Sequence, residues 1–481
     1  MDEILDITPN PENKTDKITK GEISDLIKYR IKLKKAPGME GITGEILKKF
    51  PSRAVAKLAD IFNAILELGY FPGKWKIAEI IVLPKLGKPL EKASSYRPIP
   101  LLPLLSKLFE RCYLKRLLPL LDEGKIIPDH QFGFRAGHST IEQVHRMTAL
   151  VEKTIEEKKV CSAAFLDVAQ AFDKVWQLGL LYKIRVLLPD NHYKLLRSYL
   201  HGRKFRVRFN NSYSRVCLIT AGIPQGSVLG PILYNIFTHD IPKPTEGFIG
   251  TFADDTSLAE IDEKLVAANS KLQNSLDNVS EWVIKNSTSL NTQKSNHIIF
   301  TNKKITPQPV FLNGKEVPIV SFTRSLGMYL DSRLTFKDHI KIKIKELNIK
   351  YKKMYWLLNK KSKLSIKNKL LLCNQILRPV WLNGCQIWGC ASLSNINKVE
   401  SFQSKILMTI VGAPWFVRNE DIRRELEMPT VKETIKDTVI KYEERLYLHA
   451  NNEGFELLDS SIVNRRLKRR RNVFDLPARF N

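Results

Sequence analysis

The stretch FADDTSLAE, residues 252–260, places two aspartates side by side between apolar and β-favouring residues. Adjacent carboxylates repel each other, so an ordered surface that carries both needs something to neutralise them. A solvated turn is the common explanation for an Asp-Asp pair, and a bound divalent cation is the alternative. The pair alone does not distinguish them, so the rest of the sequence has to.

A third carboxylate, Asp167, ends another apolar run, CSAAFLDV at residues 161–168. Each run is expected to form a buried strand that presents its acid at a strand end or hairpin tip. Rigid strands would hold Asp167, Asp254 and Asp255 close enough to share metal ions. Hard ions such as Mg²⁺ prefer carboxylate oxygens, and two of them about 4 Å apart can serve an in-line displacement at phosphorus.

Composition narrows the class of partner. The 481 residues exceed the size at which a single core keeps growing, so two or three subdomains are expected. The 77 Lys and Arg against 50 Asp and Glu give a net charge of +27, which favours a polyanionic partner. No apolar run approaches the length of a membrane-spanning helix, and the acidic, polar N-terminus is not typical of a secretory signal. Six scattered cysteines form no paired framework, which suits a reducing compartment.

Periodicity predicts helices, then a mixed centre built around hairpins, then a helical, Lys-rich module. Helices are expected over residues 20–38, 51–68, 104–121, 139–158 and 264–287, and from Thr335 onward. Strands are expected at 77–85 and in the runs that carry the acids, with a hairpin turn at Asn210-Asn211.

A loop between the acidic runs contributes polar groups, and segments upstream of both runs contribute basic ones. In AGIPQGSVLGPILYNIF, residues 221–237, Gly222 and Gly226 allow the backbone to approach a ligand closely, and an apolar helix follows. Arg97 and Arg135 are expected in loops, and Lys85 lies just beyond a strand. Such groups suit a triphosphate, although solvated surface charge is the more common explanation for any one of them alone.

Taken in order, eight segments resemble blocks of the reverse transcriptases of non-LTR retrotransposons, most closely the jockey group of insect LINE-like elements. The segments are KAPGMEGI (35–42), SYRPIPLLPLLSKLFER (95–111), QFGFRAGHST (131–140), FLDVAQAFDKVW (165–176), GIPQGSVLGPILYNIF (222–237), FADDTSLA (252–259), LNTQKS (290–295) and SLGMYLDSRLTFKDHI (325–340).

The resemblance implies an α/β (α+β) right-hand polymerase whose antiparallel palm sheet carries the acids. We expect a leader at 1–20, fingers and palm at 21–335, a helical thumb at 336–410 and a basic helical extension at 411–481. The tail NRRLKRRR within this extension is read as a nuclear localisation signal, an RNA-binding arm or a solvated end.

The metal ligands follow from the same resemblance. It implies that Asp167 and Asp254 hold two Mg²⁺ ions, with Mn²⁺ as a substitute. Asp255 completes the acidic pair, and the backbone carbonyl of Val168 is a further candidate ligand.

The resemblance also implies nucleotide contacts. Phe172 falls where the family carries an aromatic ring that collides with a ribose 2′-OH and selects deoxynucleotides; simple core packing is the alternative. Gln225 and Gly226 are expected to contact the nascent base pair and the template backbone.

Three basic residues complete the implied site. Lys85 and Arg97 are the candidates for gripping the β- and γ-phosphates. Lys294, in LNTQKS, fits a lysine that protonates departing pyrophosphate, and an ordinary surface lysine is an equal alternative.

The implied function is an RNA-directed DNA polymerase that extends a primer 3′-OH with dNTPs by two-metal phosphoryl transfer. An RNA template and a DNA primer are the expected partners; no protein partner is predicted. Full-length elements of this group carry an endonuclease, and no second acidic cluster with nuclease spacing is present, so we expect this chain to lack it. The expected location is the nucleus or cytoplasm, neither secreted nor in a membrane.

Two other classes of function stay open. One is a catalytically idle, retrotransposon-derived nucleic-acid-binding protein, which the intact acids disfavour. The other is an RNA-dependent RNA polymerase, which Phe172 disfavours because such an enzyme needs room for the 2′-OH.

Overall fold

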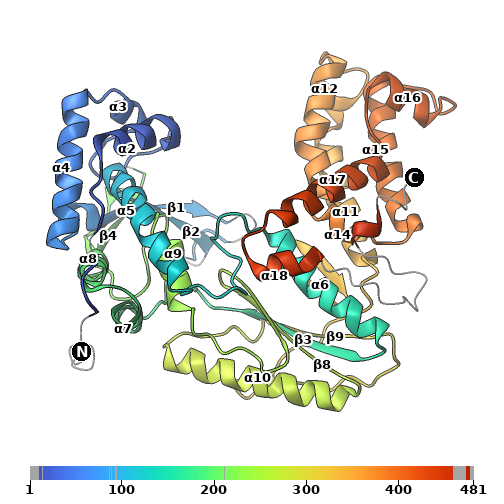
Figure 1. Ribbon diagram of the computed structural model, residues 1–481. Helices are drawn as coiled ribbons and strands as arrows, with labels where there is room; N and C mark the ends of the chain where they lie inside the picture. The colour runs from blue at the N-terminus through green and yellow to red at the C-terminus, as the bar shows by residue number, and fades with distance from the viewer. Residues whose placement is uncertain are drawn as a thin grey trace. The chain divides into compact units, whose positions relative to one another are not determined.

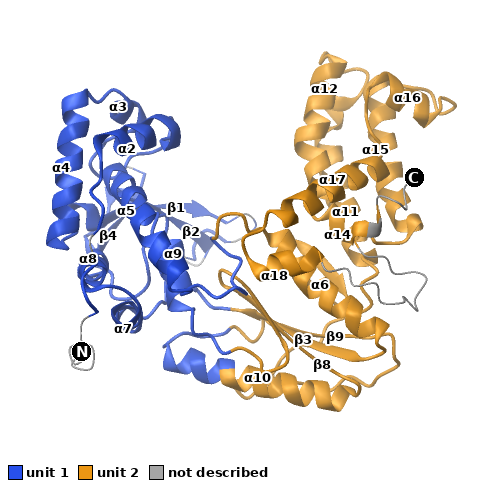
Figure 2. Ribbon diagram, in the orientation of Figure 1, with its two compact units in different colours: residues 1–134, 168–242, 279–290 blue, residues 135–167, 243–278, 291–481 orange. Residues whose placement is uncertain are grey.

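The computed structural model describes residues 10–458, apart from 14, 86, 88, 93, 94 and 211, together with residues 473–476. The chain divides into two compact units that alternate along the sequence (Figure 2). Unit 1 comprises residues 1–134, 168–242 and 279–290, and unit 2 comprises residues 135–167, 243–278 and 291–481. Each unit has its own hydrophobic core.

Helices form most of the regular secondary structure of unit 1. The longest amphipathic one, α4, ends where Gly69 adopts a left-handed conformation (φ 60°), a common helix stop. Its apolar face enters a core rich in aromatic rings, in which the rings of Phe62 and Phe109 lie 5.4 Å apart. The helices of unit 1 are α2 (Lys20–Asp25), the π-helix η1 (Leu26–Arg30), α3 (Gly44–Lys48), α4 (Ser52–Leu68), the 3₁₀-helix η2 (Gly73–Lys76), α5 (Leu104–Glu123), α7 (Gln177–Leu187), α8 (Asp190–Leu200) and α9 (Gly230–Phe237).

The sheet of unit 1 joins strands that are far apart in the sequence. Its order is β2-β1-β4-β5, with β6 also paired to β4, and β1 and β4 run parallel. Glu79 on β1 pairs with Arg206 on β4, and their side chains form an ion pair at 2.7 Å. The strands are β1 (Ile77–Pro84), β2 (Tyr96–Leu101), β4 (Lys204–Phe209), β5 (Ser212–Tyr213) and β6 (Cys217–Leu218).

Unit 2 is built on a four-stranded antiparallel sheet of order β7-β8-β3-β9. The predicted antiparallel sheet that carries the acids is therefore confirmed. Two small hairpins accompany it, β10 with β11 and β12 with β13. The strands are β3 (Val160–Asp167), β7 (Phe248–Phe252), β8 (Asp255–Asp262), β9 (Asn296–Phe300), β10 (Phe311–Leu312), β11 (Lys315–Glu316), β12 (Phe322–Ser325) and β13 (Met328–Asp331).

Two helices cover opposite faces of this sheet (Figure 1). Side chains of a strand alternate between its faces, so Ser162 on β3 and its partner Glu260 on β8 point one way. Both bond to the first part of α10 (Leu265–Lys285), through Asn269 and Ser275. The opposite face, which carries Asp167 and Asp255, is covered by α6 (Thr140–Glu156).

The rest of unit 2 is helical, as predicted from Thr335 onward. Most of its helices share one core with α6 and the sheet, whereas α16 packs through Ile422 into a small separate cluster. On α11 the ring of Tyr351 is buried, whereas Tyr355 and Trp356 are exposed. The helices are α11 (Lys337–Leu358), α12 (Ile366–Leu372), the π-helix η4 (Cys373–Leu377), α13 (Arg378–Leu382), α14 (Cys385–Trp388), α15 (Leu393–Val411), α16 (Asn419–Glu425), α17 (Val431–Tyr447), α18 (Asn452–Phe455), and the 3₁₀-helices η5 (Glu456–Leu458) and η6 (Val473–Asp475).

The helix predicted over residues 20–38 is shorter than expected. It ends at Arg30, and Ile31 is extended and buried. A Cβ on Gly44 would lie 2.7 Å from the carbonyl oxygen of Lys32, so close packing overrides the local helical pattern here.

The basic tail at residues 464–471 lies outside the described residues. In the described part of the chain, no helix combines the length and apolarity needed to cross a bilayer.

Candidate active site

Asp167 and Asp255 are brought together by strand pairing in unit 2. They are directly opposed partners on the antiparallel strands β3 and β8, so their side chains leave the same face of the sheet. Asp254 immediately precedes β8, at the tip of the β7–β8 hairpin. The predicted meeting of Asp167 with the hairpin tip is thus confirmed.

The tip of this hairpin is strained. Phe252 pairs with Asp255, which leaves a two-residue loop of Ala253 and Asp254. Such tight loops favour a positive φ at the first position, normally supplied by glycine. Ala253 has a φ of 58° and a nearly buried side chain, and strain of this kind clusters at functional sites. The local sequence did not indicate this positive φ, because an alanine stands where a glycine would be expected.

The acids repel each other in a partly dehydrated setting. Desolvation by the surrounding chain, helped by the negative charge of Asp167, raises the pKa of Asp254. Desolvation and the charges of Asp254 and Asp167 also raise the pKa of Asp255, and the positive charge of Arg324 partly offsets them. A site that disfavours its own negative charge in this way is suited to cations.

The donor atoms fit a hard divalent ion, because carboxylate oxygens are what Mg²⁺ and Mn²⁺ prefer. As the side chains lie, the described residues contain no group of three His, Cys, Asp or Glu that could hold a metal ion. Binding of an ion common to the three acids would therefore require at least one of these exposed or half-exposed carboxylates to turn. Val168 follows directly after Asp167 and forms an isolated bridge with Leu290 in unit 1.

Lys294 lies next to the acids. Its Nζ is 3.6 Å from Oδ2 of Asp167, and its side chain is 68% exposed, so it is accessible to a ligand. The turn before β9 fixes this position, because the backbone N–H of Asn291 donates to the carbonyl of Asp167. The hydroxyl of Ser295 in turn accepts from the backbone N–H of Asp167 at 3.2 Å.

A pocket of about 120 Å³ opens beside Asp167 and Asp255. Lys294 lines it, as does Leu326 in the β12–β13 turn, within the block SLGMYLDSRLTFKDHI. Among the further polar residues that line it, Arg324 and Gln143 were not singled out from the sequence. Arg324 lies one residue before a recognised block, and Gln143 lies on α6 inside an ordinary amphipathic pattern, so neither carried a signal of its own.

Phe172 belongs to unit 1, where its ring is held on two sides. It stacks on Tyr234 with ring centres 4.8 Å apart and meets the edge of Phe134 at 5.7 Å. The ring is only half buried, so core packing and a sugar-sensing role are both compatible with its position.

The loop that carries Gln225 and Gly226 is tied to the segment after Phe172. The backbone N–H of Ile223 donates to the carbonyl of Phe172 at 2.9 Å. Gln225 Nε2 donates to Asp173 Oδ1 at 2.7 Å, so Asp173 acts as a structural hydrogen-bond acceptor. Gly222 has a φ of 83°, and an added Cβ would lie 2.6 Å from the carbonyl oxygen of Asp173.

Gly226 links this loop to the sheet of unit 1. Its φ is 74°, and a Cβ would lie 3.4 Å from the carbonyl oxygen of Pro100 on β2. The expectation that Arg97 lies in a loop is wrong, because Arg97 is exposed on β2 opposite Leu83. An edge strand tolerates the neighbouring prolines that suggested a loop. Lys85 directly follows β1, and its backbone N–H donates to the carbonyl of Ser95.

Comparison with known proteins identifies relatives that align with most of this chain. Residues 84–351, more than half of the chain, match the family described as reverse transcriptase (RNA-dependent DNA polymerase). The probable RNA-directed DNA polymerase from transposon X-element of Drosophila melanogaster is 41% identical over 454 residues, covering 93% of this chain and 50% of that protein. The RNA-directed DNA polymerase from mobile element jockey of the same organism is 39% identical over 476 residues, covering 96% of this chain and 52% of that protein.

The chain spans about half the length of these curated relatives. A solved telomerase structure from Candida tropicalis, in complex with a fragment of telomeric RNA, aligns with a TM-score of 0.38 and 13% identity. The alignment covers 86% of this chain and 69% of that one.

Proposed function

We propose that this chain, which belongs to the reverse transcriptase (RNA-dependent DNA polymerase) family, is the RNA-directed DNA polymerase of a non-LTR retrotransposon of the jockey group. It would extend a DNA primer on an RNA template with dNTPs. The observation that carries the proposal is the direct pairing of Asp167 with Asp255, next to Asp254 at a hairpin tip. The similarity to jockey and X-element polymerases over most of the chain supports it.

Members of this family require a divalent cation, and two Mg²⁺ ions are proposed here, with Mn²⁺ as a substitute. Asp167, Asp254, Asp255 and the carbonyl of Val168 would hold them. When bound, the ions would neutralise the charge of the transferring phosphoryl group and of the acids themselves. Lys294, beside Asp167, would give a proton to departing pyrophosphate.

Unit 1 would supply the nucleotide contacts. The exposed guanidinium of Arg97 and the ammonium of Lys85 would grip the triphosphate by charge-assisted hydrogen bonds. The half-buried ring of Phe172, fixed by Tyr234 and Phe134, would exclude a ribose 2′-OH. Gln225 and Gly226, in the loop held to Asp173 and β2, would line the nascent base pair and the template backbone.

The larger organisation is proposed to follow the right-hand plan, with fingers and palm over residues 21–335 and a helical thumb over 336–410. The Lys-rich α11 would lie along the template–primer duplex, with Tyr355 and Trp356 exposed for stacking. The nucleus and cytoplasm are the proposed locations, because template RNA and target DNA are found there.

A primer-extension assay tests the proposal. Purified protein with poly(rA)/oligo(dT), dTTP and Mg²⁺ should extend the primer, and Asp254→Asn should abolish extension while RNA binding stays nearly unchanged. If the unmutated protein binds the template–primer but adds no nucleotide at any salt or metal concentration, the chain is instead an idle nucleic-acid-binding derivative.

A further inference from the structure

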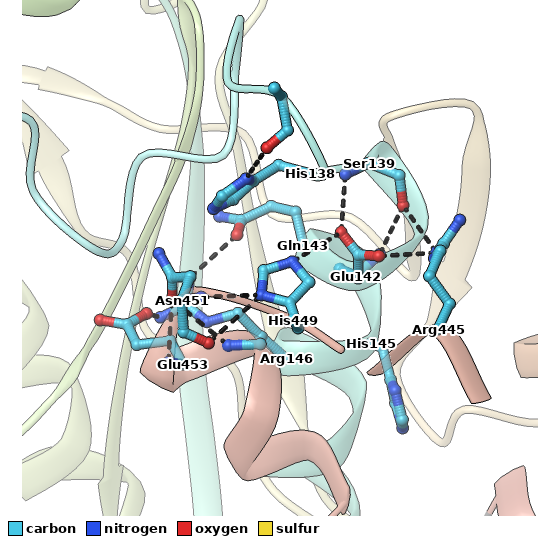
Figure 3. A network of polar contacts seen from close by, with 12 residues as sticks. His138, Ser139, Glu142, Gln143, His145, Arg146, Arg445, His449, Asn451 and Glu453 are labelled. Atoms are coloured by element: carbon cyan, nitrogen blue, oxygen red, sulfur yellow. Dashed lines mark hydrogen bonds and ion pairs between the residues drawn. The ribbon is translucent and has the colours of Figure 1, made fainter. Parts of the chain in front are cut away.

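Helix α6 connects two parts of unit 2 that are distant in the sequence. One side of α6 lies on the sheet face that carries Asp167 and Asp255, and another meets α17 and α18, near the end of the described chain. Polar side chains dominate the second contact, as Figure 3 shows for Glu142, Arg146, Arg445, His449 and Glu453. The family match ends at residue 351, so α17 and α18 lie beyond it.

Gln143 is the residue of α6 that reaches the acid pocket. It is 4% exposed and lines the pocket together with Asp167 and Asp255. Its Nε2 lies against Gly250 on β7, where even a methyl group would collide with it. Within the described part of the chain, this Nε2 has no hydrogen-bond partner. A buried donor of this kind is costly to leave unpaired, so it indicates an acceptor that arrives with a ligand.

Arg146 decides which way the Gln143 amide points. Its Nη1 donates to Oε1 of Gln143 at 2.8 Å, so the oxygen faces the arginine and the NH₂ group faces Gly250. Its guanidinium also lies 4.9 Å from the ring centre of Phe248 on β7. It also forms an ion pair with Glu453 of α18 (Figure 3), and its Nη2 donates to the carbonyl of Ile249 on β7 at 3.4 Å.

Glu453 is in turn held in place by its own helix end. The side chain of Asn451 caps α18 by accepting from the backbone N–H of Glu453 at 2.9 Å and of Gly454 at 3.3 Å. The ring of His449 bonds to the backbone of Asn451 at 3.1 Å. Hydrogen bonds within residues 449–454 therefore fix the backbone that carries the Glu453 carboxylate, the partner of Arg146.

A second attachment fixes α17 against the start of α6. Glu142, with no exposed surface, accepts from Arg445 Nη2 at 2.6 Å and closes a capping box with Ser139. Deeper in the interface His145 bonds to the hydroxyl of Tyr442 at 2.9 Å. Burial lowers the pKa of His145 to about 4, so this contact is between neutral groups near pH 7. Three side-chain contacts, Arg146–Glu453, Glu142–Arg445 and His145–Tyr442, thus hold the C-terminal helices to α6.

We propose that α17 and α18 are a positioning element of the polymerase site, acting from Glu453 through Arg146 on Gln143. The Gln143 amide donates a hydrogen bond to a sugar or phosphate oxygen of the primer strand at the pocket beside Asp167 and Asp255. The inference rests on the proposed function, because the primer end is the ligand which that function brings to the acids.

The composition of the pocket supports an acceptor of this class. Arg324 and Lys294 line it together with the neutral donor of Gln143, so cationic and donor groups gather beside the two carboxylates. A phosphodiester strand supplies many acceptor oxygens and no strong donors. Its sugar–phosphate oxygens therefore match these groups regardless of base sequence.

Single-turnover addition of one dTMP to a saturating poly(rA)/oligo(dT) duplex tests this inference. Gln143→Met keeps the volume and removes the donor, and should slow addition about tenfold or more. The KM for dTTP and the Kd for the duplex should stay within about twofold, because only alignment of the primer end is lost. Gln403→Met is the matched control: it removes a buried glutamine of unit 2 that donates to the carbonyl of Pro429, and should lower the melting temperature without slowing addition.

Glu453→Gln tests the path through Arg146. It should slow addition by a smaller factor than Gln143→Met, while the exposed neighbour changed in Glu456→Gln has no effect. In a double-mutant cycle, the Glu453→Gln effect should vanish when Gln143 is already methionine, although the two losses of melting temperature add.

Unchanged addition by Gln143→Met, or equal slowing by Glu453→Gln in both backgrounds, would overturn the inference while leaving the polymerase assignment intact. A protein that extends no primer even without substitutions would overturn the proposed function, and the inference with it.

Discussion

Asp167 and Asp255 are directly paired residues of two neighbouring antiparallel strands, and their carboxylates leave the same face of the sheet. Only one residue separates this pair from the strained Ala253, whose φ of 58° shapes the hairpin tip that presents Asp254. The sheet thus concentrates negative charge at one end and leaves it to be neutralised by something from outside.

Neutralising one acid should make the metal-free protein more stable. Because the pKa of Asp255 is raised in the folded state, its contribution to stability is present below its unfolded pKa and is lost as pH rises through the folded value. At pH 7 in EDTA, Asp255→Asn should therefore raise the melting temperature by about 1–2 °C, a small effect because the site is partly solvated. The same variant at pH 3.5 should melt close to the unmutated protein, and a lower melting temperature at pH 7 would contradict this account.

Divalent cations should stabilise the unmutated protein through the same acids. Millimolar Mg²⁺ or Mn²⁺ should raise its melting temperature in a saturable way, because an ion that binds only the folded state adds to its stability. Asp167→Asn and Asp254→Asn should each abolish most of this shift. Glu316→Gln, on the β10–β11 hairpin, is the control that should retain it; equal shifts in all variants would indicate a different metal site.

Phe172 should control the choice of sugar. Replacing it with Val removes the ring that Tyr234 and Phe134 hold in place, and rUTP incorporation relative to dTTP should rise on the order of tenfold or more. The measurement is the ratio of kcat/KM for the two nucleotides on one primer. Phe209→Val, at an exposed site on β4, should leave the ratio unchanged, and an unchanged ratio in Phe172→Val would assign the ring to core packing.

Lys294 should affect the chemical step. Lys294→Gln removes the ammonium 3.6 Å from Asp167, and kcat for primer extension should fall by about 10- to 100-fold if it acts as the acid for pyrophosphate. The KM for dTTP should change much less. Lys304→Gln, at an exposed lysine beyond β9, supplies the control for general loss of positive charge.

Gly222 should tolerate no side chain. Both Gly222 and Gly41 have a positive φ, 83° and 71°, but only at Gly222 would a Cβ meet the carbonyl of Asp173, at 2.6 Å. Gly41→Ala should cost about 1 kcal/mol, for the backbone conformation alone. Gly222→Ala should cost about 2–4 kcal/mol, because the contact with residues 172–175 must also open. Urea unfolding compares the free energies of unfolding of the two variants. Equal losses of stability would show that the loop around Gly222 can shift to accept a Cβ at little cost.

Local pattern was sufficient for the elements that carry the acids. The apolar runs before Asp167 and around the Asp-Asp pair predicted strands. The β7–β8 hairpin, which has this pair at its tip, required no information from distant residues. Lys294 and Leu326 lie in blocks that carry the family resemblance, and the structure places both at the same pocket.

Other features depend on contacts that no local pattern carries. The parallel pairing of Glu79 with Arg206 joins strands more than 120 residues apart. Arg97 looked like a loop residue because prolines follow it, yet an edge strand accommodates them. Gln143 has the sequence context of any buried helical amide, and only its approach to Gly250 in three dimensions marks it.

The two units alternate along the chain, and neither is a continuous segment. One consequence concerns modularity. A single cut or crossover cannot separate unit 1 from unit 2, because each contains three stretches bounded by the other. Fragments intended to isolate the nucleotide-contacting residues or the acids would have to be assembled from discontinuous pieces.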